Sequence, residues 1–302
     1  MTENQKNVLN MINNEQSISR IISKLDISEK RLIKIIQSLE NKGYCIKKKY
    51  NMNGEIFFDK KSIQDGKTYD IKTNSKNNRL LVISDTHLGS KFDRIDLLDK
   101  VYEYAIKNNI HIILHCGDFL DGIYNDNGRT KNKNIELQCK YALSKYPSDK
   151  SITNFLIFGN HDYASLKKYG IDIKTVIENN RIDIIPIDYG YGTVKICNEN
   201  ITMYHKLSNN SRLKSNSKIN LIGHTHKCSS DFGNNCLDIY VPSLCDLSIH
   251  NDFLGKGMLD INLRFNNNIL METDVSHLIF EPKTIVCSEN SYQFSKKNLQ
   301  KR

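Results

Sequence analysis

The chain has 302 residues and a formal net charge of +9, and 39% of its residues are hydrophobic and 25% charged. This length is enough for one large domain with a sizeable core and a small second domain. The sequence has no apolar N-terminal leader and no long apolar span, which argues against secretion and against insertion into a membrane. Its eight cysteines form no C-x-x-C pair, so we expect reduced thiols in a cytoplasmic protein.

Positive charge is concentrated near the N-terminus. Residues 1–78 contain 15 Lys and Arg against 9 Asp and Glu, so they hold six of the nine excess positive charges. An excess of this kind fits a partner that is rich in phosphate, such as nucleic acid. The N-terminal segment is therefore the expected electrostatic contact for such a partner.

Residues 1–62 show the pattern of a small separate domain. Apolar residues recur at helical spacing in three stretches, at positions 8–12, 18–25 and 32–39. Ser17 and Ser28 stand at N-cap positions, and Gly43 stands where the third helix should end. Two short strand-like stretches then flank the tetrapeptide Asn51-Met-Asn-Gly54, which is typical of a hairpin. Three helices followed by a hairpin predict a winged helix-turn-helix domain.

The third predicted helix and the hairpin carry polar side chains that suit nucleic acid. Helix residues opposite the apolar stripe would reach base edges, and hairpin lysines would reach phosphates. The candidate contacts are Lys30, Lys34, Gln37, Lys47, Lys48 and Lys49. A solvated basic face, docking onto the rest of the chain, and formation of a homo-oligomer are alternative interpretations of the same residues. Residues 63–78 are polar without apolar periodicity and are predicted to be a linker.

From residue 79 onward, apolar strand-like stretches repeatedly end in polar residues. The polar segments are SDTHLG at 84–89, GDFLDG at 117–122, GNHD at 159–162, a single His205, and GHTH at 223–226. In open α/β sheets the carboxyl ends of strands are where ligands bind, so these segments should converge. Between residues 79 and 118 a helical apolar stripe at 95–106 separates two strands, which is a β-α-β unit with an expected right-handed crossover. Further strands are predicted throughout residues 182–273.

Carboxylate, amide and imidazole groups at these strand ends are ordinary ligands for divalent first-row metals. They are too many for one ion. Two ions that share Asp118 would use them, and a pair of ions is the arrangement that stabilises the attacking and leaving oxygens of a phosphoryl transfer. The donors are oxygen and imidazole nitrogen without thiolate, which favours Mn²⁺, Fe or Zn²⁺, with Mn²⁺ expected in the cell. Cys228, Cys236 and Cys245 follow the last motif but lack metal-site spacing, so we interpret them as buried small residues.

The five segments, in this order and spacing, resemble the complete motif set of the calcineurin-like metallophosphoesterases, over roughly residues 79–246. SDTHLG together with GNHD is also similar to the Mre11/SbcD exonucleases. The resemblance implies an α/β fold, a four-layer α/β/β/α sandwich, in residues 79–287, and residues 288–302 are predicted to be a polar, frayed tail. It implies two divalent ions, the first held by Asp85, His87 and His226, the second by Asn160, His205 and His224, with Asp118 bridging them.

The remaining imidazole of the GNHD motif, His161, is catalytic in this family and is not a ligand. Asp162 is expected to orient it, so that it protonates the leaving oxygen or stabilises the phosphoryl charge. Asp121 and Arg129 are interpreted as a turn carboxylate and a solvated arginine, and His111 and His115 as residues of the core or of the support behind the ligands.

These observations favour a phosphodiesterase that acts on nucleic acid, with the N-terminal domain binding DNA. A phosphatase or phosphodiesterase for small nucleotides or phosphoproteins is the first alternative, with the helical domain used for contact or dimerisation. A non-enzymatic DNA-binding regulator is the second alternative, and the intact ligand set argues against it.

Overall fold

The computed structural model describes residues 1–42, 44, 46–59, 68–123, 128–208, 213, 215–246, 256–280 and 285–294. Its helices are α1 (Glu3–Asn13), α2 (Ile18–Leu25), α3 (Glu29–Glu40), α4 (Ile95–Lys107), α5 (Ile135–Lys145), α6 (Asn160–Tyr169) and α7 (Ile173–Glu178). Its strands are β1 (Lys47–Asn51), β2 (Ile56–Asp59), β3 (Thr68–Lys72), β4 (Asn77–Ile83), β5 (Ile112–Cys116), β6 (Thr153–Phe158), β7 (Ile184–Tyr189), β8 (Tyr191–Ile196), β9 (Glu199–Tyr204), β10 (Ile219–Ile222), β11 (Ser229–Gly233), β12 (Cys236–Tyr240), β13 (Gly257–Asn266), β14 (Ile269–Ile279) and β15 (Ile285–Gln293).

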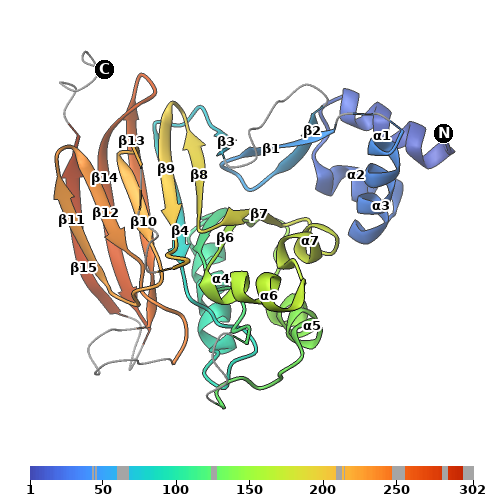
Figure 1. Cartoon of the computed structure of the whole chain (residues 1–302). Helices are drawn as coiled ribbons and strands as arrows, with labels where there is room; N and C mark the ends of the chain where they lie inside the picture. The colour runs from blue at the N-terminus through green and yellow to red at the C-terminus, as the bar shows by residue number, and fades with distance from the viewer. Residues whose placement is uncertain are drawn as a thin grey trace.

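The strands form two facing sheets, which Figure 1 shows on the left and in the centre of the molecule. One sheet has eight strands in the order β11-β12-β10-β9-β8-β3-β1-β2, and the other has seven in the order β15-β14-β13-β4-β5-β6-β7. Strands β4, β5, β6 and β7 run parallel, as do β9, β10 and β12. The carboxyl ends of each parallel set therefore lie at one edge of their sheet.

Two apolar cores hold these layers together, and β4 contributes to both. Leu80 and Val82 belong to the core between the sheets, whereas Leu81 and Ile83 belong to the core under the helices on the outer face of the seven-stranded sheet. This explains why the sequence of β4 is a continuous apolar run. The predicted α/β fold with two sheets and helices is confirmed. In the described part of the chain, however, no helix covers the outer face of the eight-stranded sheet, where Thr193 is half-exposed.

The N-terminal unit, residues 1–59, contains the three helices and the hairpin that the sequence predicts. Helices α1 and α2 pack against β2, and the apolar stripes converge on the fully buried Val8, Ile21 and Leu32. The Ser28 hydroxyl caps α3 by accepting the backbone N–H of Arg31 at 3.2 Å. The expected helix end at position 43 lies outside the described residues.

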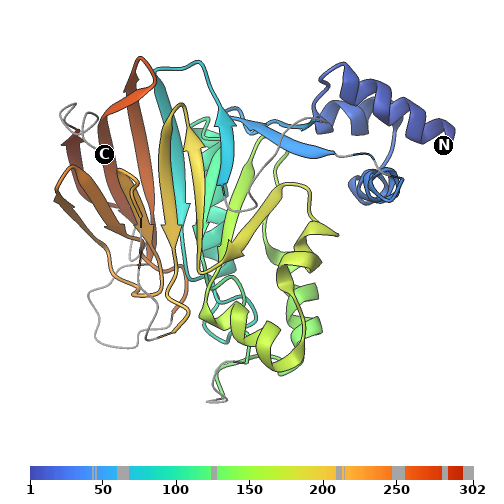
Figure 2. The ribbon, with the colours of Figure 1, turned by 45° about the horizontal axis from the view of Figure 1, so that its top comes forward.

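This unit docks on the amino-terminal edge of the seven-stranded sheet. The carbonyl of Gly54, in the turn between β1 and β2, accepts a buried hydrogen bond from Thr153 Oγ1 at 2.7 Å, and Thr153 is the first residue of β6. The Tyr50 ring meets the Phe155 ring edge-on, with centroids 5.0 Å apart. Figure 2 shows the helices of the unit, in dark blue, projecting from one end of the sandwich. The contacts make the hairpin part of the inter-sheet core rather than an independent wing.

Two sequence predictions are wrong in part. Residues 68–72 of the predicted linker form β3, which pairs with β1 on one side and β8 on the other and so joins the N-terminal unit to the eight-stranded sheet. Its only fully buried apolar side chain is Ile71, and the surrounding polar residues conceal the alternation. Residues 288–293 of the predicted tail belong to β15, which pairs with β14. Among the described residues no helix is both long and apolar enough to cross a membrane.

Candidate dinuclear metal centre

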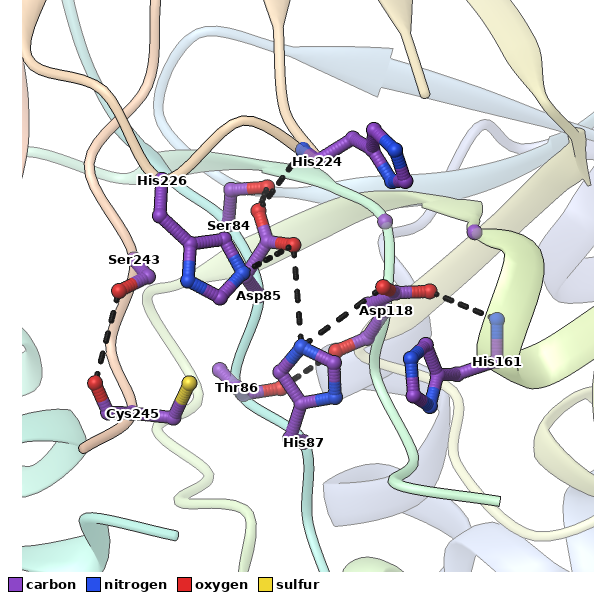
Figure 3. Close-up of polar contacts among 12 residues, drawn as sticks. Ser84, Asp85, Thr86, His87, Asp118, His161, His224, His226, Ser243 and Cys245 are labelled. Atoms are coloured by element: carbon purple, nitrogen blue, oxygen red, sulfur yellow. Dashed lines mark hydrogen bonds and ion pairs between the residues drawn. The ribbon is translucent and has the colours of Figure 1, made fainter. Parts of the chain in front are cut away.

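Polar side chains from five loops meet at the carboxyl ends of the parallel strands. The convergence that the sequence predicts involves Asp85, His87, Asp118, Asn160, His205, His224 and His226. In one half of this site, shown in Figure 3, His226 Nε2 lies 3.2 Å from Asp85 Oδ1. His87 Nε2 lies 3.8 Å from the same oxygen and 3.7 Å from Asp118 Oδ2.

The other half of the site is centred on Asn160. Its Oδ1 lies 3.3 Å from His205 Nε2 and 2.9 Å from His224 Nδ1. His205 Nε2 is also 3.2 Å from Asp118 Oδ2, the oxygen that faces His87. The Asp118 carboxylate therefore lies between the two halves, where the sequence analysis expects a bridging ligand.

His205 is held in one orientation from behind. Its Nδ1 lies 2.7 Å from the carbonyl oxygen of Cys116, at the end of β5. A carbonyl only accepts, so Nδ1 donates this hydrogen bond and Nε2 is the nitrogen that faces Asp118 and Asn160. A histidine that binds a metal is usually held in this way, with its second ring nitrogen donating to a backbone carbonyl.

The backbone at the site is strained. Positive φ angles, between 42° and 72°, occur at Asp85, His87, Asp118, His224 and His226. For residues with a Cβ this left-handed region costs about 1–2 kcal/mol each, so the surrounding structure must enforce it. The loops after β4 and β5 do so by pairing with each other: the Asp85 N–H donates to the Gly117 carbonyl at 2.9 Å, and the His87 N–H to that of Asp118 at 3.0 Å.

Several buried polar atoms here make no hydrogen bond, which fits a cation. Asp85 Oδ1 and both ring nitrogens of His87 have ion-pair neighbours but no hydrogen bond with any residue that the structure describes. Such groups are costly to bury unless an ion satisfies them. Donor atoms of His87, Asp118 and His161 lie within 4.8 Å of one another, as do those of Asp118, His205 and His224. The donor set and its two-part geometry suit two divalent ions.

The ionisable groups at the site change one another's pKa values. Burial acts to raise the pKa of Asp118, but His205 and His161 outweigh it and the pKa falls well below its usual value. Burial acts to lower the pKa of His205, whereas Asp118 and Asp85 raise it to about 9. His87 behaves differently, because burial and the adjacent His161 lower its pKa well below the usual 6.5. At neutral pH the Asp118 carboxylate is thus ionised and His87 neutral, the forms that bind metals.

His161 lies beside the ligands and is positioned by Asp121. Its backbone N–H donates to Asp118 Oδ1 at 2.9 Å, and its Nδ1 lies 2.6 Å from the Asp121 carbonyl. Arg129 donates from Nε and Nη2 to Asp121 Oδ1 at 3.0 and 2.8 Å, and its Nη2 is 3.3 Å from the His161 ring nitrogens. Asp121 is 1% exposed. The expectation of a turn carboxylate and a solvated arginine is therefore wrong.

Asp162 does not have the contacts expected of a residue that orients His161. Its Oδ2 accepts the N–H groups of Phe119 and Gly159 at 3.0 and 2.9 Å, and its Oδ1 accepts that of Leu120 at 2.8 Å. The carboxylate thus joins the start of α6 to the loop that carries Asp118. It supports the site through the backbone, and Asp121 takes the place that the sequence analysis gives to Asp162.

Two further residues behind the ligands are expected from the sequence to be core residues. His115 is fully buried, with Nε2 at 3.1 Å from Thr86 Oγ1, and burial lowers its pKa to about 3, in keeping with the expectation. Cys245 is buried too, but its sulfur and one nitrogen each of His87 and His226 lie within 4.8 Å of one another. Cysteine spacing alone offers no reason to place this thiol at the site.

The candidate nucleic-acid contacts fall into two groups. Lys30 and Lys34 are exposed on α3, as is Lys47 on β1, whereas Lys49 is half-buried. The Gln37 amide instead donates to Asn179 Oδ1 at 2.7 Å, across to the end of α7. Lys48 also faces inward, where burial lowers its pKa and the charge of Glu178 acts to raise it. Gln37, Lys47 and Lys48 line a cavity of about 400 Å³ between the N-terminal unit and α7.

Three solved structures are similar to this chain at low sequence identity. They are vacuolar protein sorting 29 from Cryptosporidium parvum (16% identity, TM-score 0.43, covering 72% of this chain and 98% of that one), YfcE, a phosphoesterase from E. coli (14%, 0.41, 65% and 97%), and an archaeal phosphodiesterase (14%, 0.37, 65% and 99%). A comparison with curated proteins found no match.

The sequence profile of the calcineurin-like phosphoesterases matches residues 78–243, which is more than half of the chain. The matched region begins in β4 and ends after β12, so it contains all five ligand-bearing loops. The chain therefore belongs to the calcineurin-like phosphoesterase family.

Proposed function

We propose that this protein is a phosphodiesterase that depends on two divalent metal ions, with Mn²⁺ as the expected ion and nucleic acid as the substrate class. The observation that carries the proposal is the position of Asp118, whose Oδ2 lies 3.7 Å from His87 Nε2 and 3.2 Å from His205 Nε2. In the proposed assignment Asp85, His87 and His226 hold one ion, and Asn160, His205 and His224 hold the other. Bound ions would supply a nucleophile at neutral pH and stabilise charge on the phosphoryl oxygens.

The residues beside the ligands have separate roles in this proposal. The Nδ1 of His161 donates to the Asp121 carbonyl, which leaves Nε2 to hold or deliver a proton at the leaving oxygen. Arg129, held by the Asp121 carboxylate, offers the remaining N–H groups of its guanidinium to a phosphoryl oxygen. Asp121 thus positions both the proton donor His161 and the cationic side chain of Arg129. Asp162 holds the loop that carries Asp118.

Hydrolysis of bis-p-nitrophenyl phosphate with added Mn²⁺ tests the catalytic part. We expect His161→Ala to lower the rate by about 10²–10⁴-fold, the usual contribution of a positioned acid or base. His111→Ala is the matched control, because this histidine lies before β5 at the opposite edge of the sheet, where its ring hydrogen-bonds to the Ser151 carbonyl. Equal rates for the His161→Ala variant and the wild type would contradict the assignment of His161.

The N-terminal unit is proposed to contact the nucleic acid as a helix-turn-helix whose hairpin is docked on the sheet, through the exposed lysines of α3 and β1. Because such contacts act on phosphates, binding to a labelled DNA duplex should weaken steeply with salt. The double variant Lys30→Glu with Lys34→Glu should reduce both the affinity and the salt slope. Lys107→Glu, an exposed lysine at the end of α4, is the control for a change of charge alone.

A substrate panel of single- and double-stranded DNA, RNA, cyclic nucleotides and phosphomonoesters distinguishes the alternatives. Activity confined to small nucleotides or monoesters, with DNA affinity unaffected by the lysine variants, would favour a phosphatase or phosphodiesterase for small nucleotides or phosphoproteins. The observation that favours this alternative is that Gln37 and Lys48 face the end of α7. The N-terminal unit would then serve for contact with the rest of the chain and not for binding DNA.

A further inference from the structure

A buried thiol adjoins one half of the metal centre. Cys245 is 2% exposed, and its sulfur lies within 4.8 Å of one nitrogen of His87 and one of His226. Figure 3 shows its side chain on the same side of the site as both imidazoles. These are the two histidines that the proposed function assigns to the ion shared with Asp85.

The chain holds this cysteine in place through its backbone. After β12 the segment runs back along the end of β4, where the Leu244 N–H donates to the Ser84 carbonyl at 3.0 Å and Ser243 pairs with Ser84 as an isolated parallel bridge. A second bridge joins Cys245 to Asp93. The backbone of residues 243–245 is therefore paired on both sides and held beside the end of β4.

A second observation at the same place points to a ligand. His87 is 2% exposed, and neither of its ring nitrogens makes a hydrogen bond with the residues that the structure describes. An imidazole buried without partners is costly unless a cation takes up a lone pair. The thiol and the unsatisfied imidazole thus border the same space.

We propose that Cys245 is a ligand for the divalent ion held by Asp85, His87 and His226. This half of the centre would then prefer Zn²⁺, Co²⁺ or Fe²⁺, and Mn²⁺ would remain the expected ion of the other half only. Binding breaks the S–H bond, forms a sulfur–metal bond and releases the proton to solvent. A thiolate is a soft ligand that suits zinc, whereas manganese prefers oxygen donors. The other half has only oxygen and nitrogen donors, so the two positions would differ in the metals they select. This inference rests on the proposed function, because it requires that the centre binds metal.

Cobalt substitution of the full chain tests the proposal without relying on activity. Bound Co²⁺ gives visible ligand-field bands with any of these donors, and a thiolate adds an intense near-ultraviolet charge-transfer band. We expect both signals when Co²⁺ is added to the metal-free wild type. Cys245→Ser should lose the near-ultraviolet band and keep the visible bands. Cys236→Ser, at the far end of β12, is the matched control and should keep both.

The same variants should separate the metals by affinity. Loss of an outer-shell partner alone costs about 10–100-fold in metal affinity, so Cys245→Ser should weaken Zn²⁺ binding at one position by at least that factor. Its Mn²⁺ affinity should change far less, since a hydroxyl replaces the thiol. Equal losses for both metals would contradict the proposed selectivity.

The outcomes are distinguishable. Visible bands without a near-ultraviolet band in the wild type would overturn the role of Cys245 and leave the metal centre intact. Absence of both would overturn the metal centre, and the proposed function with it. If the serine variant does not fold, X-ray absorption of the zinc-loaded wild type decides: a sulfur neighbour at about 2.3 Å supports the proposal, and only nitrogen and oxygen neighbours at about 2.0–2.1 Å refute it.

Discussion

Gly159 gives the sharpest test of the site geometry. It is the N-cap of α6, with a φ of −94° that any residue adopts, so its backbone does not require glycine. The space around it does. A Cβ at this position would lie 2.1 Å from Asp118 Oδ1 and 2.6 Å from His205 Nε2. Gly159→Ala should therefore displace the shared carboxylate and one of its partners.

The size of the effect follows from these distances. Non-bonded heavy atoms sit at about 3.5 Å or more, so Asp118 must move by roughly 1.4 Å or the start of α6 must shift. Overpacking of this kind costs about 1–3 kcal/mol of stability. Movement of Asp118 would also leave the buried His161 N–H without its 2.9 Å acceptor, a further loss of about 1–3 kcal/mol. A displacement of 1 Å in a catalytic site lowers the rate by about 10²-fold.

The assays are metal content after dialysis, hydrolysis of bis-p-nitrophenyl phosphate, and urea unfolding. Gly233→Ala is the matched control, because Gly233 lies in β11, where an added Cβ would have no described atom within 4 Å. This control should stay within about 0.5 kcal/mol of the wild type. A Gly159→Ala variant with normal metal content and normal activity would show that Asp118 does not occupy the bridging position.

Three other perturbations have defined outcomes. Arg129→Ala should reduce kcat for phosphodiester hydrolysis by about 10²–10³-fold, the effect of losing one donor to the reacting group, and an unchanged kcat would exclude Arg129 from the site. Thr153→Val removes the buried hydrogen bond to the Gly54 carbonyl and should lower the unfolding free energy by about 1–3 kcal/mol in urea titrations, whereas no change would mean that the N-terminal unit docks without it. Burial lowers the pKa of His277, so the unfolded chain takes up its proton first and the free energy of unfolding should fall as pH drops below about 6.5; His277→Gln should flatten that slope, and an identical slope in the two proteins would contradict burial of a neutral His277.

Local pattern is enough to predict most of the fold and the convergence of the ligands. A buried strand such as β4 is a continuous apolar run, and each ligand follows its strand directly, so the sheet topology brings Asp85 and Asp118 together. Strand β3 is not predicted because its burial depends on neighbours from β1 and β8 that are distant in sequence. Only Ile71 is fully buried there, and one apolar residue does not make a pattern.

The residues around the ligands are harder to predict for a related reason. Asp121 and Arg129 meet only because the loop between them folds back, and no periodicity reveals that contact. Asp162 adjoins His161 in sequence, yet successive helical residues point in different directions, and its carboxylate turns to the backbone of residues 119 and 120. Cys245 reaches the site because residues 243–245 pair with Ser84 and with Asp93, contacts that its spacing from other cysteines does not reveal.

The docking of the hairpin at the start of β6 sets a minimum length for any substrate that engages the whole molecule. The ligands lie beyond the opposite ends of the parallel strands, and the five residues of β5 alone extend about 16 Å. At about 3.4 Å per base pair, a duplex must be at least about five base pairs long to bridge both places. If nucleic acid is the substrate, as proposed, shorter fragments would gain nothing from the N-terminal lysines, and cleavage efficiency should step upward with oligonucleotide length beyond that point.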